Sequence, residues 1–215
     1  MIVPGEPWGI CIPCANCAAV GMGGGEKAVQ YITLADDTLT LGPSVGVGGG
    51  ITGIGAINDN LAVTHYHPPA VEIISAEGEV LHRLDNKTLD RLLFRSPWYL
   101  TVAPYQSSIF VSDFSMNTVT MLDQRLEVLK TFRAPSLLES PLGIKPLNDI
   151  QVLIACGAQG ERIVHLNHSS GKMKAILGKE DGLERPKALA FCPDTRTLYV
   201  SPVTYCRSIQ RYKLH

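Results

Sequence analysis

The sequence predicts an all-β fold, a β-propeller of about five four-stranded antiparallel blades of which the last is incomplete. Three observations lead to this prediction. Segments with one pattern begin at Pro7, Ile51, Pro97, Pro141 and Pro186, at intervals of 44–46 residues. Each begins a series of short apolar runs rich in the Val, Ile, Leu, Thr and Tyr of β-strands. Most connections between runs suit hairpins and are too short for the crossover helices of a parallel sheet.

The expected strands keep the same order in each unit. The segment that opens a unit is its first strand; CAAVGM, NLAVTH, SIFVSD, VLIACG and TLYVSP are the second strands; and a third strand follows each. Fourth strands follow in the first four units, as TLTLGP, EVLHRL, EVLKTF and KMKAIL. Four such strands in about 45 residues are typical of a propeller blade. We therefore expect one propeller domain, residues 1–215, with blades at 7–50, 51–96, 97–140, 141–185 and 186–215. Only the link over residues 85–96 could hold a short helix.

Composition argues against several classes of function unless a local patch of charge supplies the binding. The 215 residues carry a formal net charge of −1, which gives no overall attraction to nucleic acid or to an acidic membrane surface. No apolar run approaches the roughly 18 residues of a membrane span. Prolines at positions 4, 7 and 13 interrupt the apolar N-terminus, which does not resemble a secretory signal. We therefore expect a cytoplasmic protein with reduced cysteines and no membrane partner.

The segment CIPCANC places Cys11, Cys14 and Cys17 in the first hairpin. A structural zinc site needs four ligands, often as two such pairs. The other cysteines lie singly in later units, so ordinary thiols in a hairpin are favoured over a zinc site. The glycine-rich GGGITG leads into a strand rather than a helix, which disfavours a phosphate site. We expect no metal and no small-molecule cofactor.

Two Asn-Asp pairs occur at matching places, in INDN at residues 57–60 and in LNDI at residues 147–150. They superficially resemble the calcium ligands of lactonase-type propeller hydrolases. Asn and Asp are also the favoured residues of hairpin turns, and a repeat array places its turns in register. We therefore interpret them as turns.

The third unit, SIFVSDFSMNTVTMLDQRLEVLKTF, resembles an NHL repeat: an apolar strand, Val-x-Asp, a short polar loop, a Val-led strand, a turn and a closing strand. Such repeats form the C-terminal region of tripartite-motif proteins, many of which are ubiquitin ligases. NHL propellers usually have six blades, so the resemblance implies that this chain is part of a larger ring. It also implies a recognition module that has no catalytic activity of its own.

Loops on one face of the propeller are the expected binding surface, because loops vary freely on a rigid scaffold. This face collects the links between second and third strands and the links between blades. In RLDNKTLDRLLFRSPWY, basic residues lie beside aromatic ones, a combination that can hold RNA phosphates and stack bases. The residues predicted to bind a partner are His65, Tyr66, His67, Arg91, Arg95, Trp98, Asp113, Phe114, Tyr205 and Arg207. None is predicted to be catalytic.

Three functions compete at this point. The favoured hypothesis is a platform that binds a protein partner, such as the substrate-selecting part of a ubiquitin ligase. An RNA-binding propeller is the alternative. A calcium-dependent propeller hydrolase is the third hypothesis.

Overall fold

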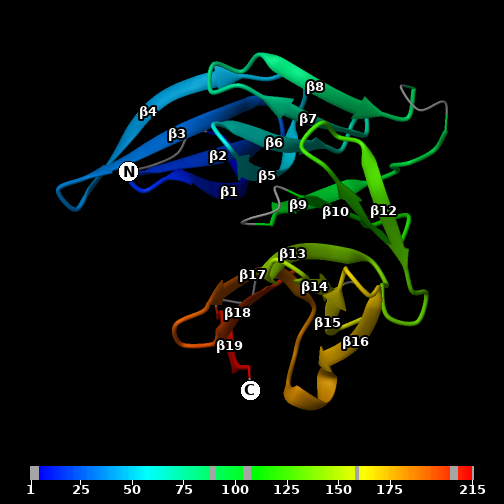
Figure 1. Ribbon diagram of the computed structural model, residues 1–215. Coiled ribbons are helices and arrows are strands. Elements are labelled where there is room, and N and C mark those ends of the chain that lie inside the picture. The colour runs from blue at the N-terminus through cyan, green and yellow to red at the C-terminus, as the bar shows by residue number, and fades with distance from the viewer. Residues whose placement is uncertain (1–4, 88–90, 104–107, 158–159, 204–207, 215) are drawn as a thin grey trace.

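The computed structural model describes residues 5–87, 91–103, 108–157, 160–203 and 208–214. These residues form nineteen strands in five antiparallel sheets and one short 3-10 helix. The sheets follow one another around an arc as the blades of a β-propeller (Figure 1). Strand order within every blade is the sequence order, so each blade is a meander. The predicted all-β propeller with five blades is confirmed.

The strands of the first three blades have the following bounds. Blade 1 contains β1 (Glu6–Cys14), β2 (Cys17–Gly23), β3 (Ala28–Ala35) and β4 (Thr38–Gly46). Blade 2 contains β5 (Ile51–Ile57), β6 (Asn60–His65), β7 (Ala70–Ile74) and β8 (Val80–Asp85). Blade 3 contains β9 (Pro97–Val102), β10 (Ile109–Asp113), β11 (Thr118–Leu122) and β12 (Val128–Arg133).

The last two blades differ in their number of strands. Blade 4 contains β13 (Pro141–Asn148), β14 (Gln151–Cys156), β15 (Arg162–Asn167) and β16 (Lys172–Leu177). The 3-10 helix η1 (Lys179–Asp181) follows. Blade 5 contains β17 (Pro186–Cys192), β18 (Thr197–Pro202) and β19 (Gln210–Lys213), so the expected incomplete blade has three strands among the described residues.

The hydrophobic core lies in layers between neighbouring blades. Val71 of blade 2 packs with Leu100 and Val111 of blade 3, and Phe110 of blade 3 packs with Ile154 of blade 4. Further layers join blade 1 to blade 2 and blade 4 to blade 5. A single blade cannot bury its own two faces, so the fold is stabilised mainly by contacts between neighbours.

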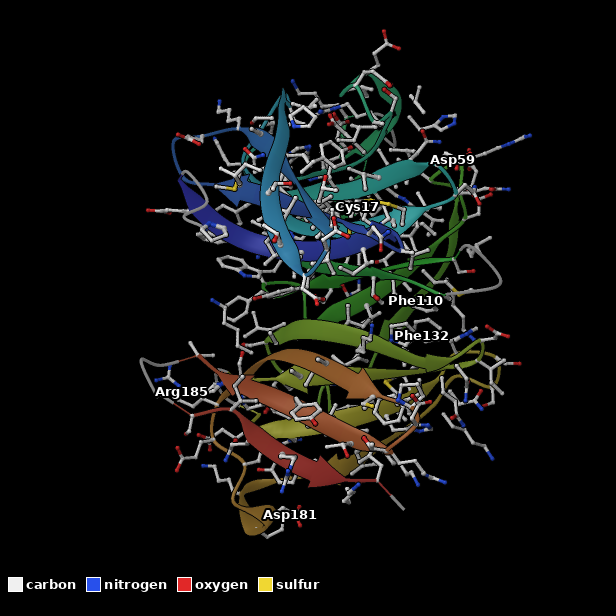
Figure 2. All side chains as sticks on the ribbon, turned by 90° about the vertical axis from the view of Figure 1, so that its left-hand side faces the viewer. Cys17, Asp59, Phe110, Phe132, Asp181 and Arg185 are labelled. Atoms are coloured by element: carbon white, nitrogen blue, oxygen red, sulfur yellow. A yellow bond between two sulfur atoms is a disulfide. The ribbon has the colours of Figure 1, made fainter. Side chains whose placement is uncertain are left out.

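The arc is open between blades 1 and 5 (Figure 1), and in Figure 2 blade 1 lies above and blade 5 below. One face of blade 1 packs on blade 2, and the other carries exposed aliphatic side chains. These are Ile10, Ile12, Leu34, Leu39 and Leu41. The expected sixth blade stays a prediction.

In the link between blades 2 and 3, residues 85–87 and 91–96 form no helix, and residues 88–90 lie outside the described part of the chain. The side chain of Asn86 holds this link instead. Its Oδ1 accepts the backbone N–H groups of Leu93 and Phe94, and its Nδ2 donates to the carbonyl oxygen of Phe94. Leu93 and Phe94 are thereby buried in the core between the two blades.

No helix among the described residues is long and apolar enough to cross a membrane.

Candidate functional site

Four aromatic side chains from three blades meet on the loop face of the propeller. Trp98 of β9 is at their centre, and its ring centroid lies 5.5 Å from that of Trp8, 5.3 Å from that of Tyr66 and 6.3 Å from that of Phe114. These distances lie within the range of attractive aromatic pairs. Trp8 is 37% exposed and Tyr66 47%, whereas Trp98 and Phe114 are partly buried. We call these four residues the aromatic cluster.

The two tryptophans occupy equivalent positions in their blades. Each directly follows the proline near the start of its first strand, at a point where the pairing with the next strand shifts register. Such a bulge re-aims a side chain out of the regular pleat. The same position in blade 2 is Thr52, a small and buried residue. The two indoles therefore meet across blade 2.

The indole of Trp8 packs against Gly23, the last residue of β2. A Cβ atom on Gly23 would lie 2.7 Å from Cδ1 and 2.8 Å from Nε1 of Trp8, which is closer than real Cβ contacts. The indole therefore lies directly on the backbone of Gly23. Any side chain at position 23 would displace the ring.

A pocket of about 310 Å³ opens beside the aromatic cluster, between blades 1 and 2. Its lining residues are Trp8, Gly23, Gly24, Lys27, Gly50, Ile51, Thr52, Tyr66 and His67. Trp8 also lines the central channel, a cavity of about 450 Å³ between the first strands of all five blades. The aromatic cluster thus lies where a surface pocket and the central channel meet.

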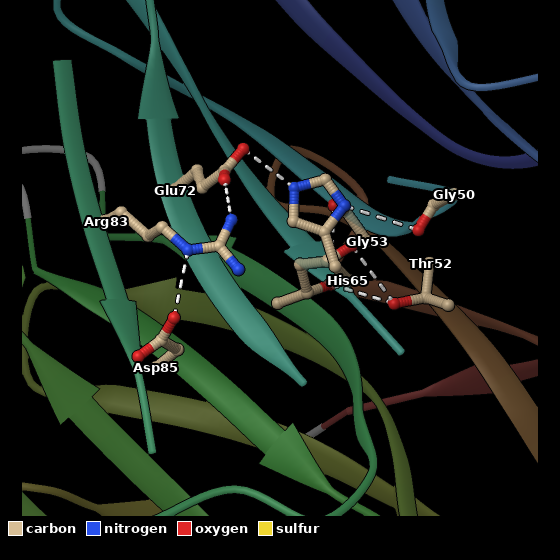
Figure 3. A network of polar contacts seen from close by, with 8 residues as sticks. Gly50, Thr52, Gly53, His65, Glu72, Arg83 and Asp85 are labelled. Carbon is tan, nitrogen blue, oxygen red and sulfur yellow. Dashed lines mark hydrogen bonds and ion pairs between the residues drawn. The ribbon is translucent and has the colours of Figure 1, made fainter. Parts of the chain in front are cut away.

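A partly buried polar network supports this face from within blade 2 (Figure 3). Nε2 of His65 lies 2.9 Å from Oε2 of Glu72, and the other carboxylate oxygen of Glu72 pairs with Arg83. Arg83 in turn donates to Asp85. Nδ1 of His65 lies 3.4 Å from the carbonyl oxygen of Gly50, in the link from blade 1.

The charges of this network favour an ionised glutamate. Burial alone would raise the pKa of Glu72, but the hydrogen bond and charge of His65, together with Arg83, lower it. His65 is only 2% exposed and Glu72 1%. His65 was predicted to contact a partner; the structure places its ring behind the surface, against Glu72, and the contact itself stays a prediction.

Asp113 ties two loops together below the aromatic cluster. Its carboxylate accepts the backbone N–H groups of Arg95, Ser96, Ser115 and Met116 at 2.7–3.1 Å. The side chain is completely buried. The structure thus places Asp113 behind the surface, and its predicted contact with a partner stays a prediction. Its role is to hold the link before Trp98 against the loop that carries Phe114.

The other predicted binding residues lie at the surface or outside the described residues. Arg91 and Arg95 are exposed, and Arg95 joins the loop face through its backbone bond to Asp113. His67 lines the pocket beside Trp8. Tyr205 and Arg207 lie outside the described residues.

Two cysteines of the first hairpin pair with each other. Cys14 and Cys17 pair across the β1–β2 turn, with Cα atoms 5.2 Å apart, and form a disulfide. The expectation of reduced thiols is therefore corrected for these two residues. Cys11 remains a thiol, and burial raises its pKa to about 12. Within the described ranges, no three His, Cys, Asp or Glu side chains gather as a metal would require.

The two Asn-Asp pairs are hairpin turns, as predicted. Asn58 and Asp59 join β5 to β6, and Asn58 has a positive φ of 51°. Asp149 and Ile150 join β13 to β14, where the Asn148 side chain accepts the N–H of Ile150. Asn and Asp suit these positions because they tolerate left-handed backbone and bond to nearby amides.

No protein-family model matches the sequence, and no curated protein matches it. Solved structures match its fold. A functionally unknown protein from Desulfotomaculum acetoxidans has a TM-score of 0.71 at 12% identity, over 94% of this chain and 64% of that one. Hydrazine synthase of Kuenenia stuttgartiensis has a TM-score of 0.69 at 13% identity, over 98% of this chain and 62% of that one.

Virginiamycin B lyase from Staphylococcus aureus matches with a TM-score of 0.62 at 12% identity, over 97% of this chain and 84% of that one. This chain spans less than two thirds of the length of the Desulfotomaculum and Kuenenia chains. At identities this low, the likeness shows the propeller fold alone.

Proposed function

We propose that this chain is a non-catalytic recognition module that binds a protein partner through the aromatic cluster on its loop face. The observation that carries the proposal is the meeting of Trp8, Tyr66, Trp98 and Phe114 from three blades, with Trp8 and Tyr66 partly open to solvent. Large aromatic residues dominate the binding energy of protein interfaces. The buried bonds of His65 and Asp113 stabilise the loops that carry the cluster.

The finer identity of the module rests on its resemblance to NHL repeats. On that basis we propose that it selects substrates for a ubiquitin ligase in the cytoplasm. The Cys14–Cys17 pair offers a check of the compartment, since disulfides are rare in the cytosol. Because the structure pairs these two residues, a cytoplasmic site requires that the pair be reduced in the cell. Thiol labelling of protein trapped directly from cells checks this: two labelled thiols would support a cytoplasmic site, and an unlabelled pair would contradict it.

RNA binding is the second candidate, favoured by one observation. Arg91 and Arg95 are exposed in the link that leads to Trp98, so cations and aromatic rings belong to the same face. Basic groups with stacking rings are the usual means of holding single-stranded RNA.

A capture experiment from cell extract tests the two candidates against each other. We compare the wild type, Trp98→Ala and Tyr199→Ala, each with and without nuclease. Tyr199 is an exposed aromatic residue of blade 5 outside the cluster, so it is a matched control. The proposal expects protein capture that survives nuclease and is lost only with Trp98→Ala. Capture that nuclease abolishes favours RNA, and equal capture by all three proteins contradicts both candidates.

A further inference from the structure

The pocket beside the aromatic cluster offers hydrogen-bond donors without partners. The indole N–H of Trp8, the ammonium group of Lys27 and the hydroxyl of Tyr66 have no hydrogen-bond partner among the residues that the structure describes. An indole and an ammonium group can only donate. Thr52, which also lines the pocket, is already bonded to the carbonyl oxygens of Thr64 and Pro97. A complementary ligand must therefore supply acceptors.

The pocket also offers flat apolar surface. Trp8 and Tyr66 stand at its wall, and the glycines Gly23, Gly24 and Gly50 contribute backbone without side chains. The Trp8 ring is held in place by its contact with Gly23, so little conformational entropy is lost when a ligand packs on it. The ligand should therefore combine apolar rings with carbonyl acceptors and few N–H groups.

A proline-rich segment has this chemistry. Proline has no backbone N–H, and a polyproline II helix makes no internal hydrogen bonds, so its carbonyl oxygens stay free to accept. Trp8 and Tyr66 line the pocket, and Trp98, which contacts both rings, continues the aromatic surface beyond it. Aromatic-lined grooves recognise proline-rich peptides in other folds.

We infer that the protein partner binds as a proline-rich segment in the polyproline II conformation, packed on the aromatic cluster, with the Trp8 indole donating to one of its carbonyl oxygens. This inference rests on the proposed function, because it specifies which part of a protein partner the same site accepts. Tyr66 and Lys27 supply further donors at the same pocket.

A peptide titration tests the inference. The probe is a capped peptide of ten prolines, and the control is a capped peptide of alternating glycine and serine with the same length. Tryptophan fluorescence and calorimetry follow binding to the full chain. We expect saturable binding of the proline peptide only. Trp8→Phe keeps a ring and removes the N–H donor, so it should weaken binding about tenfold. A tenfold change in affinity corresponds to a binding free energy of about 1.4 kcal/mol. Tyr199→Ala should bind as the wild type does.

Two results would overturn the inference: no saturable binding of the proline peptide up to millimolar concentration, or equal binding by the wild type and Trp8→Phe. Tyr66→Phe provides a second conservative variant if Trp8→Phe does not fold. The capture experiment separates this failure from failure of the proposed function. Nuclease-resistant capture that depends on Trp98, without peptide binding, refutes the proline-rich ligand alone, whereas loss of both signals refutes both.

Discussion

Blades 2 and 3 each place a buried polar residue next to an aromatic residue of the cluster, and the two neighbours have opposite roles. His65 ends β6 and is buried against Glu72, while Tyr66 follows it into solvent. Asp113 ends β10 and is buried among backbone amides, while Phe114 follows it beside Trp98. The buried polar residues stabilise the loops, and the aromatic cluster is the surface those loops present. At each of these strand ends, two consecutive residues therefore have different roles: the first stabilises the loop, and the second lies in the aromatic cluster.

Removing the carboxylate of Asp113 should have the largest effect on stability. Asp113→Ala leaves the N–H groups of Arg95, Ser96, Ser115 and Met116 without their acceptor, and unmade buried hydrogen bonds cost roughly 1–3 kcal/mol each. We expect the free energy of unfolding to fall by about 3 kcal/mol or more in urea titrations.

Asp123→Ala is the matched control for this prediction. Asp123 also accepts two backbone N–H groups, those of Arg125 and Glu127, but in an exposed turn. Its loss should cost about 1 kcal/mol or less. Equal losses for the two variants would contradict a special supporting role for Asp113.

The network of blade 2 should make stability depend on pH. The pKa of Glu72 is lowered in the folded state, so the unfolded state binds more protons at acidic pH. The contribution of Glu72 is therefore complete above its unfolded pKa, about 4.3, and is lost as the pH falls through its lower folded pKa. Urea titrations from pH 3 to pH 7 should show this fall for the wild type and a smaller one for Glu72→Gln. Glu79→Gln changes an exposed glutamate and should show the same pH dependence of stability as the wild type. If Glu72→Gln also shows the pH dependence of the wild type, Glu72 is not the group responsible.

The central ring of the cluster should matter more for binding than for folding. Trp98→Ala removes the contacts that join Trp8, Tyr66 and Phe114. We expect at least tenfold weaker binding of the proline peptide, as for an interface hot spot, and a smaller loss of stability than in Asp113→Ala. Calorimetry and urea titration measure the two quantities. If Trp98→Ala loses as much stability as Asp113→Ala but binds the peptide normally, Trp98 stabilises the fold and does not contact the peptide.

The smallest effect is expected for the Tyr66 hydroxyl. Tyr66→Phe keeps the ring, which contacts Trp98 edge to face, and removes one donor. Binding should weaken by about twofold to fivefold without a change in melting temperature, because Tyr66 is exposed and a neutral hydrogen bond has a net value of about 1 kcal/mol. Tyr66→Ala should weaken binding further. Equal binding by the two variants would show that the ring does not contact the peptide.

The repeat period and the apolar strand pattern were enough to predict the blades, because hairpins are local and each blade repeats the same order. Tyr66, Trp98 and Phe114 were predicted as binding residues from their loop positions. The roles of His65 and Asp113 were not predictable, since their burial depends on Glu72 and on backbone amides elsewhere in the fold. Trp8 was missed as a site residue, although its proline-tryptophan pair repeats at Pro97-Trp98 and offered a signal.

The sequence by itself determined the all-β class, the 44–46-residue rhythm and the Asn-Asp turns, because strand alternation and turn chemistry act over a few residues. Only the tertiary structure decided that Trp8 and Trp98 meet across blade 2. Their contact requires bulges at equivalent positions and the small Thr52 between them. Such convergence depends on how whole blades pack, which no local pattern encodes.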